Sequence, residues 1–187
     1  INQSAFRNCP LENVKLDSIV AIGNDAFRIE RNVVNVDGAA VTSAMTSLTL
    51  PVSAQSLGEG AFRNNAFTSI TFNADSVKIG SYAFADCAQL TQVKVNAAVI
   101  PSYAFYGCKQ LASVEIGKDV TLIGQYAFAD TSVRSLAVDA NNAVMRAAKD
   151  ANNNDYITDK ATGTQLILAS FATEAFSSDV ITTIGDG

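Results

Sequence analysis

The chain has 187 residues, 48% of them hydrophobic, and it carries a net charge of −5 with no histidine. Its 13 Lys and Arg residues form no run, so it lacks the basic stripe that a phosphate backbone attracts, which argues against a nucleic-acid partner. Without histidine, Ser-His and Cys-His catalytic pairs are excluded, as is a zinc site of the usual His/Cys kind.

One motif recurs from the first residue onward: an aliphatic residue, four spacers of which the last is Ala, and then Phe. Its complete copies occupy residues 1–6, 22–27, 57–62, 79–84, 100–105 and 123–128, and a further copy opens at Ile184 without reaching its Phe. Self-similarity at a period of about 20 to 50 residues is typical of a solenoid, since one unit buries its apolar face only against a stacked neighbour. We therefore expect one solenoid domain over residues 1–187, with the motif Phe residues stacked as an internal ladder.

A glycine follows the aliphatic residue of most copies. The positions are Gly23, Gly58, Gly80, Gly124 and Gly185, with Pro101 standing in once. A glycine there is expected to allow a backbone bend that a side chain would strain. A phosphate cradle is the alternative, but glycines scattered over separate coils cannot surround one phosphate.

Each Phe is followed by a segment in which apolar and polar residues alternate. These segments are residues 11–16, 45–50, 67–72, 90–95, 111–116 and 133–138. Alternation with period two predicts a short strand with one buried face, and six such strands, one per coil, should form a parallel sheet.

The three cysteines, Cys9, Cys87 and Cys108, each lie three residues after a motif Phe. An odd number leaves at least one thiol free unless it pairs with another molecule. In stacked coils their Cβ vectors would run parallel, which does not suit a disulfide. We expect buried thiols that act as small hydrophobic groups.

Two regions depart from the regular spacing. One lies within residues 1–138, and the other follows them. About a dozen extra residues near 28–43, including the run 33–38, predict a protruding hairpin. Residues 139–187 are too long for one coil, and we expect a longer, irregular repeat, truncated at its C-terminal end, with a small hairpin around 156–168.

An aliphatic-Gly pair, then Ala-Phe, then Cys, then Leu-x-x-Val-x-Ile, on a period of 21 to 23 residues, closely resembles the BspA-like leucine-rich repeat. Residues 79–95 match at every motif position, and the resemblance extends over residues 1–138. The fold to expect is then a right-handed, curved leucine-rich-repeat solenoid of about seven to eight turns, with a parallel β-sheet on the concave side and short helical turns or irregular segments opposite. The resemblance also implies a secreted or cell-surface protein that adheres to host matrix proteins or to other cells.

In such a solenoid the polar strand positions point to the concave face, the usual ligand surface. The candidate ligand-binding residues are Asn13, Lys15, Ser47, Thr49, Ser69, Thr71, Gln92, Lys94, Ser113, Glu115 and Ser135. This surface is short-chained and nearly neutral, so it could dock a protein or glycan, and it could equally be an inert solvated face.

Tyr82, Tyr103 and Tyr126 occupy the same place in three successive copies, two residues before Phe. An aromatic stripe at this spacing could stack on sugar rings or anchor a protein. The alternative is a packing ladder with hydroxyls at the solvent edge.

Residues 150–157 imitate the first half of a calcium loop, but Asp155 stands where the glycine is expected and Ala161 where the last acidic ligand is expected. An Asx-rich turn is the better reading, and we predict no metal and no cofactor. Carboxylates are scattered over the turns rather than paired, so we predict no enzymatic activity.

The sequence therefore predicts a non-enzymatic extracellular or cell-surface module that presents a rigid surface to a protein or glycan, with host matrix among the candidates. No apolar stretch approaches the roughly 20 residues of a membrane span. The alternatives are a structural spacer that carries other domains and a β-helix enzyme acting on polysaccharide. The oligomeric state is left open.

Overall fold

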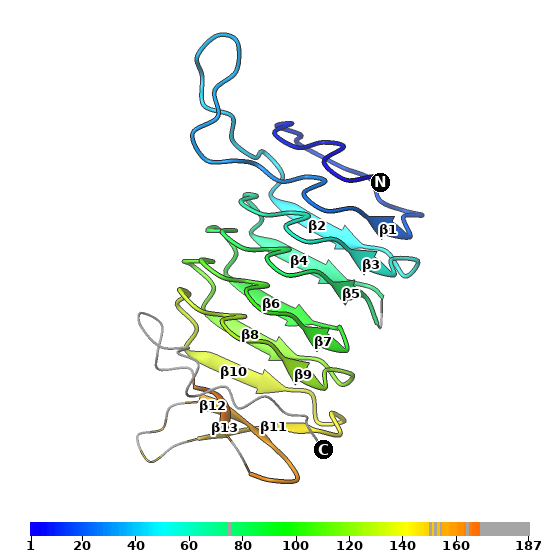
Figure 1. Cartoon of the computed structure of the whole chain (residues 1–187). Helices are drawn as coiled ribbons and strands as arrows, with labels where there is room; N and C mark the ends of the chain where they lie inside the picture. The colour runs from blue at the N-terminus through cyan, green and yellow to red at the C-terminus, as the bar shows by residue number, and fades with distance from the viewer. Residues whose placement is uncertain (75, 150, 152, 154, 164, 169–187) are drawn as a thin grey trace.

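The computed structural model describes residues 1–74, 76–149, 151, 153, 155–163 and 165–168, and it winds into a stack of coils (Figure 1). Most coils carry one four-residue strand and one two-residue strand. The longer strands are β2 (Ser47–Leu50), β4 (Ser69–Phe72), β6 (Gln92–Val95), β8 (Ser113–Ile116) and β10 (Ser135–Val138). The short strands are β1 (Ala21–Ile22), β3 (Ser56–Leu57), β5 (Lys78–Ile79), β7 (Val99–Ile100) and β9 (Leu122–Ile123).

The described residues form a parallel-strand solenoid without helices, so the side opposite the sheet consists of irregular turns and not of short helical turns. None of these residues belongs to a helix that could span a membrane. From β2 to β10 the chain completes about four turns, fewer than the seven to eight expected. The motif copy that opens at Ile184 lies outside the described residues.

The longer strands pair in parallel and in register, which confirms the alternation read from the sequence. Ser47 lies opposite Ser69 and Thr49 opposite Thr71, while Leu48 and the other apolar partners face the interior. Alternate residues of a strand point to opposite faces, so each longer strand buries one set and exposes the other.

The expected six-stranded sheet is wrong in two respects. Residues 11–16 form no strand, although Leu16 is buried and Lys15 exposed as the alternation requires. The remaining strands divide into a β2-β4 pair and a β10-β8-β6 sheet, and no ladder joins β4 to β6. We call this break in hydrogen bonding, which also separates β5 from β7, the seam.

Pro101 accounts for the seam on the side of the short strands. In neighbouring coils the N–H of the motif glycine donates to the aliphatic carbonyl one coil earlier, as from Gly80 to Leu57 (2.8 Å) and from Gly124 to Ile100 (2.7 Å). Proline has no N–H to donate. The ladder from β1 through β3 to β5 therefore stops one coil before Pro101, and β7 pairs only with β9 in the described chain.

The motif itself forms a tight double turn that hydrogen-bonds to the next coil. The N–H of every motif Phe except Phe128 donates to the carbonyl of the motif Ala one coil later, for example from Phe27 to Ala61 and from Phe105 to Ala127, both at 2.8 Å. The residue two places before each Phe has a positive φ, and in Tyr82, Tyr103 and Tyr126 this φ is 56–61°. Such a backbone is uncommon for an aromatic residue, so the stacking of the coils must hold it in place.

The Phe ladder is confirmed. Successive rings of the motif Phe residues stack with centroids 5.1 to 5.9 Å apart and nearly parallel planes. All are buried except Phe6, at the end of the ladder, which is 39% exposed. The ladder is thus the axis of one continuous hydrophobic core.

The prediction that the motif glycines allow a strained backbone bend is wrong. None of Gly23, Gly58, Gly80 and Gly124 has a positive φ. A Cβ on any of them would instead lie 2.4 to 2.5 Å from a backbone nitrogen of the preceding coil. Glycine is required there because the coils approach too closely for a side chain.

Cys87 and Cys108 are buried free thiols, as expected, whereas Cys9 is half-buried. The thiol of Cys87 donates to the carbonyl of Phe62 (3.4 Å), and the thiol of Cys108 donates to the carbonyl of Phe84 (3.2 Å), in each case in the preceding coil. Asn65 fills the same place in its own coil and donates to the carbonyls of Phe27 and Phe62. In these three coils the slot therefore holds a small group that donates a hydrogen bond to a motif Phe carbonyl, whereas Glu30 occupies it after Phe27.

We expect Cys87 and Cys108 to resist modification in the folded protein. Burial raises the pKa of Cys87 from 9.0 to about 12 and also raises the pKa of Cys108, so neither forms the reactive thiolate near pH 8. Above about pH 9 the unfolded chain loses a proton that folded Cys87 keeps, and stability should fall. Ellman's reagent at pH 8 should titrate only Cys9 rapidly and all three thiols in urea; rapid reaction of all three without urea would contradict this.

Both irregular regions contain hairpins. In the insertion at 28–43, Val34 pairs with Ala40 in an antiparallel bridge, and the hairpin projects from the stack with Val36 fully exposed (Figure 1). At the other end β11 (Met145–Lys149), β12 (Asp155–Asp159) and β13 (Gln165–Leu168) form an antiparallel sheet next to β10. The expected hairpin around 156–168 corresponds to β12 and β13.

Candidate functional site

The candidate ligand-binding residues lie together on the outward side of the longer strands, which we call the strand face. Ser113 and Glu115 are half-buried, and the other candidates are exposed. Asn13 and Lys15 extend the face beyond β2 from a segment that has no strand of its own. The period-two pattern thus predicts which side chains are exposed even where the ladder is missing, and ligand binding by this surface stays a prediction.

Two hollows occupy the strand face. The first, of about 410 Å³, lies between residues 13–17 and β2 and includes Asn13, Lys15, Ser47 and Thr49. The second, of about 280 Å³, spans the seam and includes Ser69, Thr71, Gln92, Lys94, Ser113 and Glu115. All candidate residues of the strand face except Ser135 therefore border a hollow.

A charged pair lies in the second hollow. Lys94 Nζ is 2.5 Å from Glu115 Oε1 and 3.8 Å from Asp139 Oδ2. The hydrogen bond to Glu115 raises the pKa of Lys94, so this lysine stays charged through the neutral range. Because both side chains are more than 40% exposed, the pair adds little stability, and it leaves this part of the face close to neutral.

The three tyrosines form a second aromatic ladder outside the Phe ladder. The ring of Tyr103 stacks between those of Tyr82 (4.7 Å) and Tyr126 (5.1 Å), and Tyr106 meets it edge-on. Arg63 lies 5.3 Å from the centroid of the Tyr82 ring. Partial burial is the main cause of the raised pKa of Tyr103. Both faces of Tyr103 are thus occupied, which favours a packing ladder over stacking on sugars.

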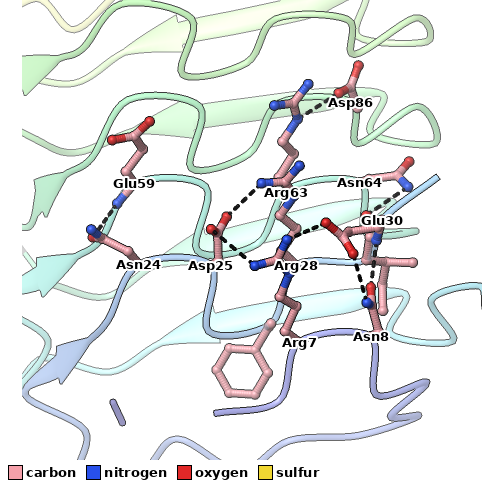
Figure 2. A network of polar contacts seen from close by, with 12 residues as sticks. Arg7, Asn8, Asn24, Asp25, Arg28, Glu30, Glu59, Arg63, Asn64 and Asp86 are labelled. Carbon is pink, nitrogen blue, oxygen red and sulfur yellow. Dashed lines mark hydrogen bonds and ion pairs between the residues drawn. The ribbon is translucent and has the colours of Figure 1, made fainter. Parts of the chain in front are cut away.

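Sequence reasoning missed a network of Arg and carboxylate side chains on the turns of the first coils (Figure 2). Arg7, Arg28 and Arg63 each follow a motif Phe directly. This recurrence is the sequence feature from which a column of arginines could have been predicted. Asp25 lies 4.0 Å from Arg7 and 3.1 Å from Arg28. Glu30 accepts hydrogen bonds from Arg7 and Asn8, and the bond from Arg7 is the main reason its pKa is lowered.

Asp86 joins this network to the insertion. Its carboxylate is only 6% exposed and accepts from Arg31 Nη2 at 2.8 Å and from Arg63 Nε at 2.9 Å. Arg31 belongs to the insertion and lies 55 residues from Asp86 in sequence. The two guanidinium groups compensate the charge of this buried carboxylate, and removing either of them would leave that charge less well compensated.

Among the described residues, no group of three or more His, Cys, Asp or Glu side chains could hold a metal ion. The calcium-like stretch 150–157 includes residues 150, 152 and 154, which lie outside the described residues.

The family model described as BspA type leucine rich repeat region matches residues 1–43 and 39–154, with six copies. A leucine rich cell surface protein from Faecalibacterium prausnitzii A2-165, known from a crystal structure, matches 63% of this chain with 15% sequence identity and a TM-score of 0.27. The match spans 58% of that protein's chain. No curated protein matches the chain.

Proposed function

Because the chain belongs to the BspA-type leucine-rich repeat family, we propose that it is a non-enzymatic cell-surface or secreted module that binds a protein or glycan through its strand face. Host matrix proteins are the first partners to test, as the family resemblance suggests.

The observation that carries this proposal is the alignment of outward polar side chains across successive coils. Ser47 and Ser69 stand side by side, as do Thr49 and Thr71, and Lys94 stands beside Glu115. Short hydroxyl side chains lose little conformational entropy when a partner orders them, so they suit a docking surface. The two hollows give a partner places to insert side chains or sugar rings.

The backbone supports a rigid surface. The Phe ladder runs through the described coils, and the turn ladder of Phe N–H to Ala C=O bonds continues across the seam, from Phe84 to Ala104 at 2.9 Å. A surface fixed in this way avoids the cost of ordering a flexible loop on binding.

The carboxylates described above support a binding module rather than an enzyme. Asp25, Glu30, Asp86 and Glu115 are all engaged by Arg or Lys side chains. A glycosidase requires two carboxyl groups facing a common substrate, and these four serve ion pairs instead.

We expect Gln92→Arg, in the second hollow, to weaken binding at least about tenfold, because a long charged side chain would fill the hollow and expose the partner to an unpaired charge. Retention of the chain on purified extracellular matrix proteins and on a glycan array measures this effect.

Gln125→Arg is the matched control, since it makes the same change at an exposed turn position away from the strand face. Equal losses in both variants would show that net charge, not the strand face, governs binding. If the unaltered chain is retained on no surface, a structural spacer becomes the better account.

A further inference from the structure

A polar pocket of about 380 Å³ lies at the base of the insertion, and none of its lining residues belongs to the strand face. It is lined by Arg28, Ile29, Glu30, Arg31, Arg63, Asn64 and Asp86. A cavity of about 410 Å³ shares several of these residues and is walled on its other side by Val33, Ala40 and Val41 of the hairpin. Two adjoining pockets of this size are at the lower end of those that bind small molecules.

The network around the pocket has an excess of positive charge in a chain whose net charge is −5. Four guanidinium groups face three carboxylates, which leaves one unbalanced positive charge: Arg7, Arg28, Arg31 and Arg63 against Asp25, Glu30 and Asp86. A local positive excess between low-dielectric walls attracts an anion even to an acidic protein.

Two of these guanidinium groups are held in place with donors to spare. Buried Asp86 binds Arg31 through Nη2 and Arg63 through Nε, and among the described residues these are the hydrogen bonds of the two guanidinium groups. A guanidinium has five N–H donors, so most of them are available to a ligand. Contact with the Tyr82 ring further fixes Arg63. Donors fixed before binding require little ordering when a ligand arrives.

The chemistry around the pocket narrows the class of anion. A guanidinium fork matches a carboxylate or a phosphate in two parallel hydrogen bonds, so the neighbouring groups must distinguish the two anions. The Nδ2 of Asn64 donates to the Ile29 carbonyl, and its Oδ1 accepts no hydrogen bond within the described part of the chain. The adjoining cavity adds the short amide and hydroxyl groups of Asn32, Thr42, Ser43 and Gln89 beside the apolar hairpin wall. Carboxylate recognition next to hydroxyl partners and an apolar surface describes a carboxylated sugar.

We propose that this pocket binds the carboxylate of an acidic sugar residue in a glycan, with Arg31 and Arg63 as its principal contacts and the adjoining cavity holding the neighbouring sugar. The pocket is separate from the strand face. Binding of an acidic sugar in the pocket is therefore independent of whether the strand face binds a partner.

The test is a calorimetric titration of the full chain, at low ionic strength, with a disaccharide of glucuronic acid and N-acetylglucosamine. N,N′-diacetylchitobiose serves as the neutral comparison. We expect the acidic disaccharide to bind at least about tenfold more tightly, and Arg63→Gln to reduce its affinity about tenfold or more, since one charged hydrogen-bonding partner is lost. Arg31→Gln should also weaken binding, and because the Arg31 side chain is 71% exposed this variant should fold.

Arg134→Gln is the matched control, because it removes one exposed arginine outside the network, and it should leave the affinity unchanged. If Arg63→Gln loses its circular dichroism spectrum, Arg31→Gln decides the matter alone. The proposal fails if the neutral disaccharide binds equally well, if Arg134→Gln weakens binding as much as Arg31→Gln, or if acetate and phosphate bind as tightly as the acidic sugar. Tighter binding of an oligoglutamate peptide would also overturn it, in favour of an acidic protein ligand.

Discussion

Phe84→Ala is expected to lower the free energy of unfolding by about 3 to 5 kcal/mol, a large part of the roughly 5 to 15 kcal/mol that stabilises a domain. The Phe84 ring is fully buried and stacks between Phe62 (5.9 Å) and Phe105 (5.3 Å), with Phe72 edge-on at 5.9 Å. Truncation removes the apolar burial and leaves a cavity in the middle of the ladder. For a chain of this size the melting temperature should fall by roughly 6 to 20 °C.

Phe6→Ala is the matched control because it makes the same truncation at the end of the ladder. Phe6 is 39% exposed and has one stacked neighbour, Phe27, at 5.1 Å. We expect a loss of about 1 kcal/mol, since much of the ring already faces solvent. Thermal unfolding followed by circular dichroism compares the two variants. A decrease of only a few degrees for Phe84→Ala, or one no larger than for Phe6→Ala, would show that the ladder is not the principal core.

The parts of this fold that follow from periodicity could be predicted from the sequence. Motif spacing places one Phe in each coil, and alternation determines which strand residues face outward, because side chains alternate across a strand regardless of its partner. For the same reason Asn13 and Lys15 are exposed as predicted, although residues 11–16 form no ladder. Alternation specifies which side chains are buried, but it does not specify whether a neighbouring backbone lies within hydrogen-bonding distance.

The position of the seam could not be predicted from the sequence alone, because the effect of Pro101 depends on which backbone hydrogen bonds the coils form. Pro101 was visible in the sequence as a replacement for the motif glycine. Its consequence depends on the N–H of that position donating to the preceding coil, as in Gly80 and Gly124. A bend-forming glycine and a donating glycine give the same sequence pattern, so the pattern alone could not predict where the ladder stops.

The Arg and carboxylate network could be predicted only in part. The recurrence of Arg directly after Phe places Arg7, Arg28 and Arg63 in one column of the stacked turns. The partner of Arg31, however, is Asp86, and the contact depends on the path of the insertion between them. That path has no periodicity, and the sequence contains no signal that sets its register against the coils.

Gly80→Ala is expected to destabilise the protein by about 3 kcal/mol, near the upper end of the usual cost of overpacking. The added Cβ would lie 2.5 Å from the backbone nitrogen of Glu59 and from the carbonyl carbon of Gly58. These are backbone atoms, so they cannot turn away as a side chain could. Separating the coils would also stretch the bond from the Gly80 N–H to the Leu57 carbonyl, now 2.8 Å long. Urea denaturation gives the free energy of unfolding.

Gly38→Ala separates this close approach from the intrinsic preference of glycine. Gly38 has a φ of +79° in the exposed hairpin, and no atom of the described residues would lie within 4 Å of a Cβ at this position. Alanine at this place should cost about 1 kcal/mol, from backbone strain alone. Gly80 lacks a positive φ, so strain predicts almost no loss for it and the contact between coils predicts a large one. A Gly80→Ala variant as stable as the unaltered protein would therefore mean that the coils can move apart at this rung, and that the motif glycine is not needed for their close stacking.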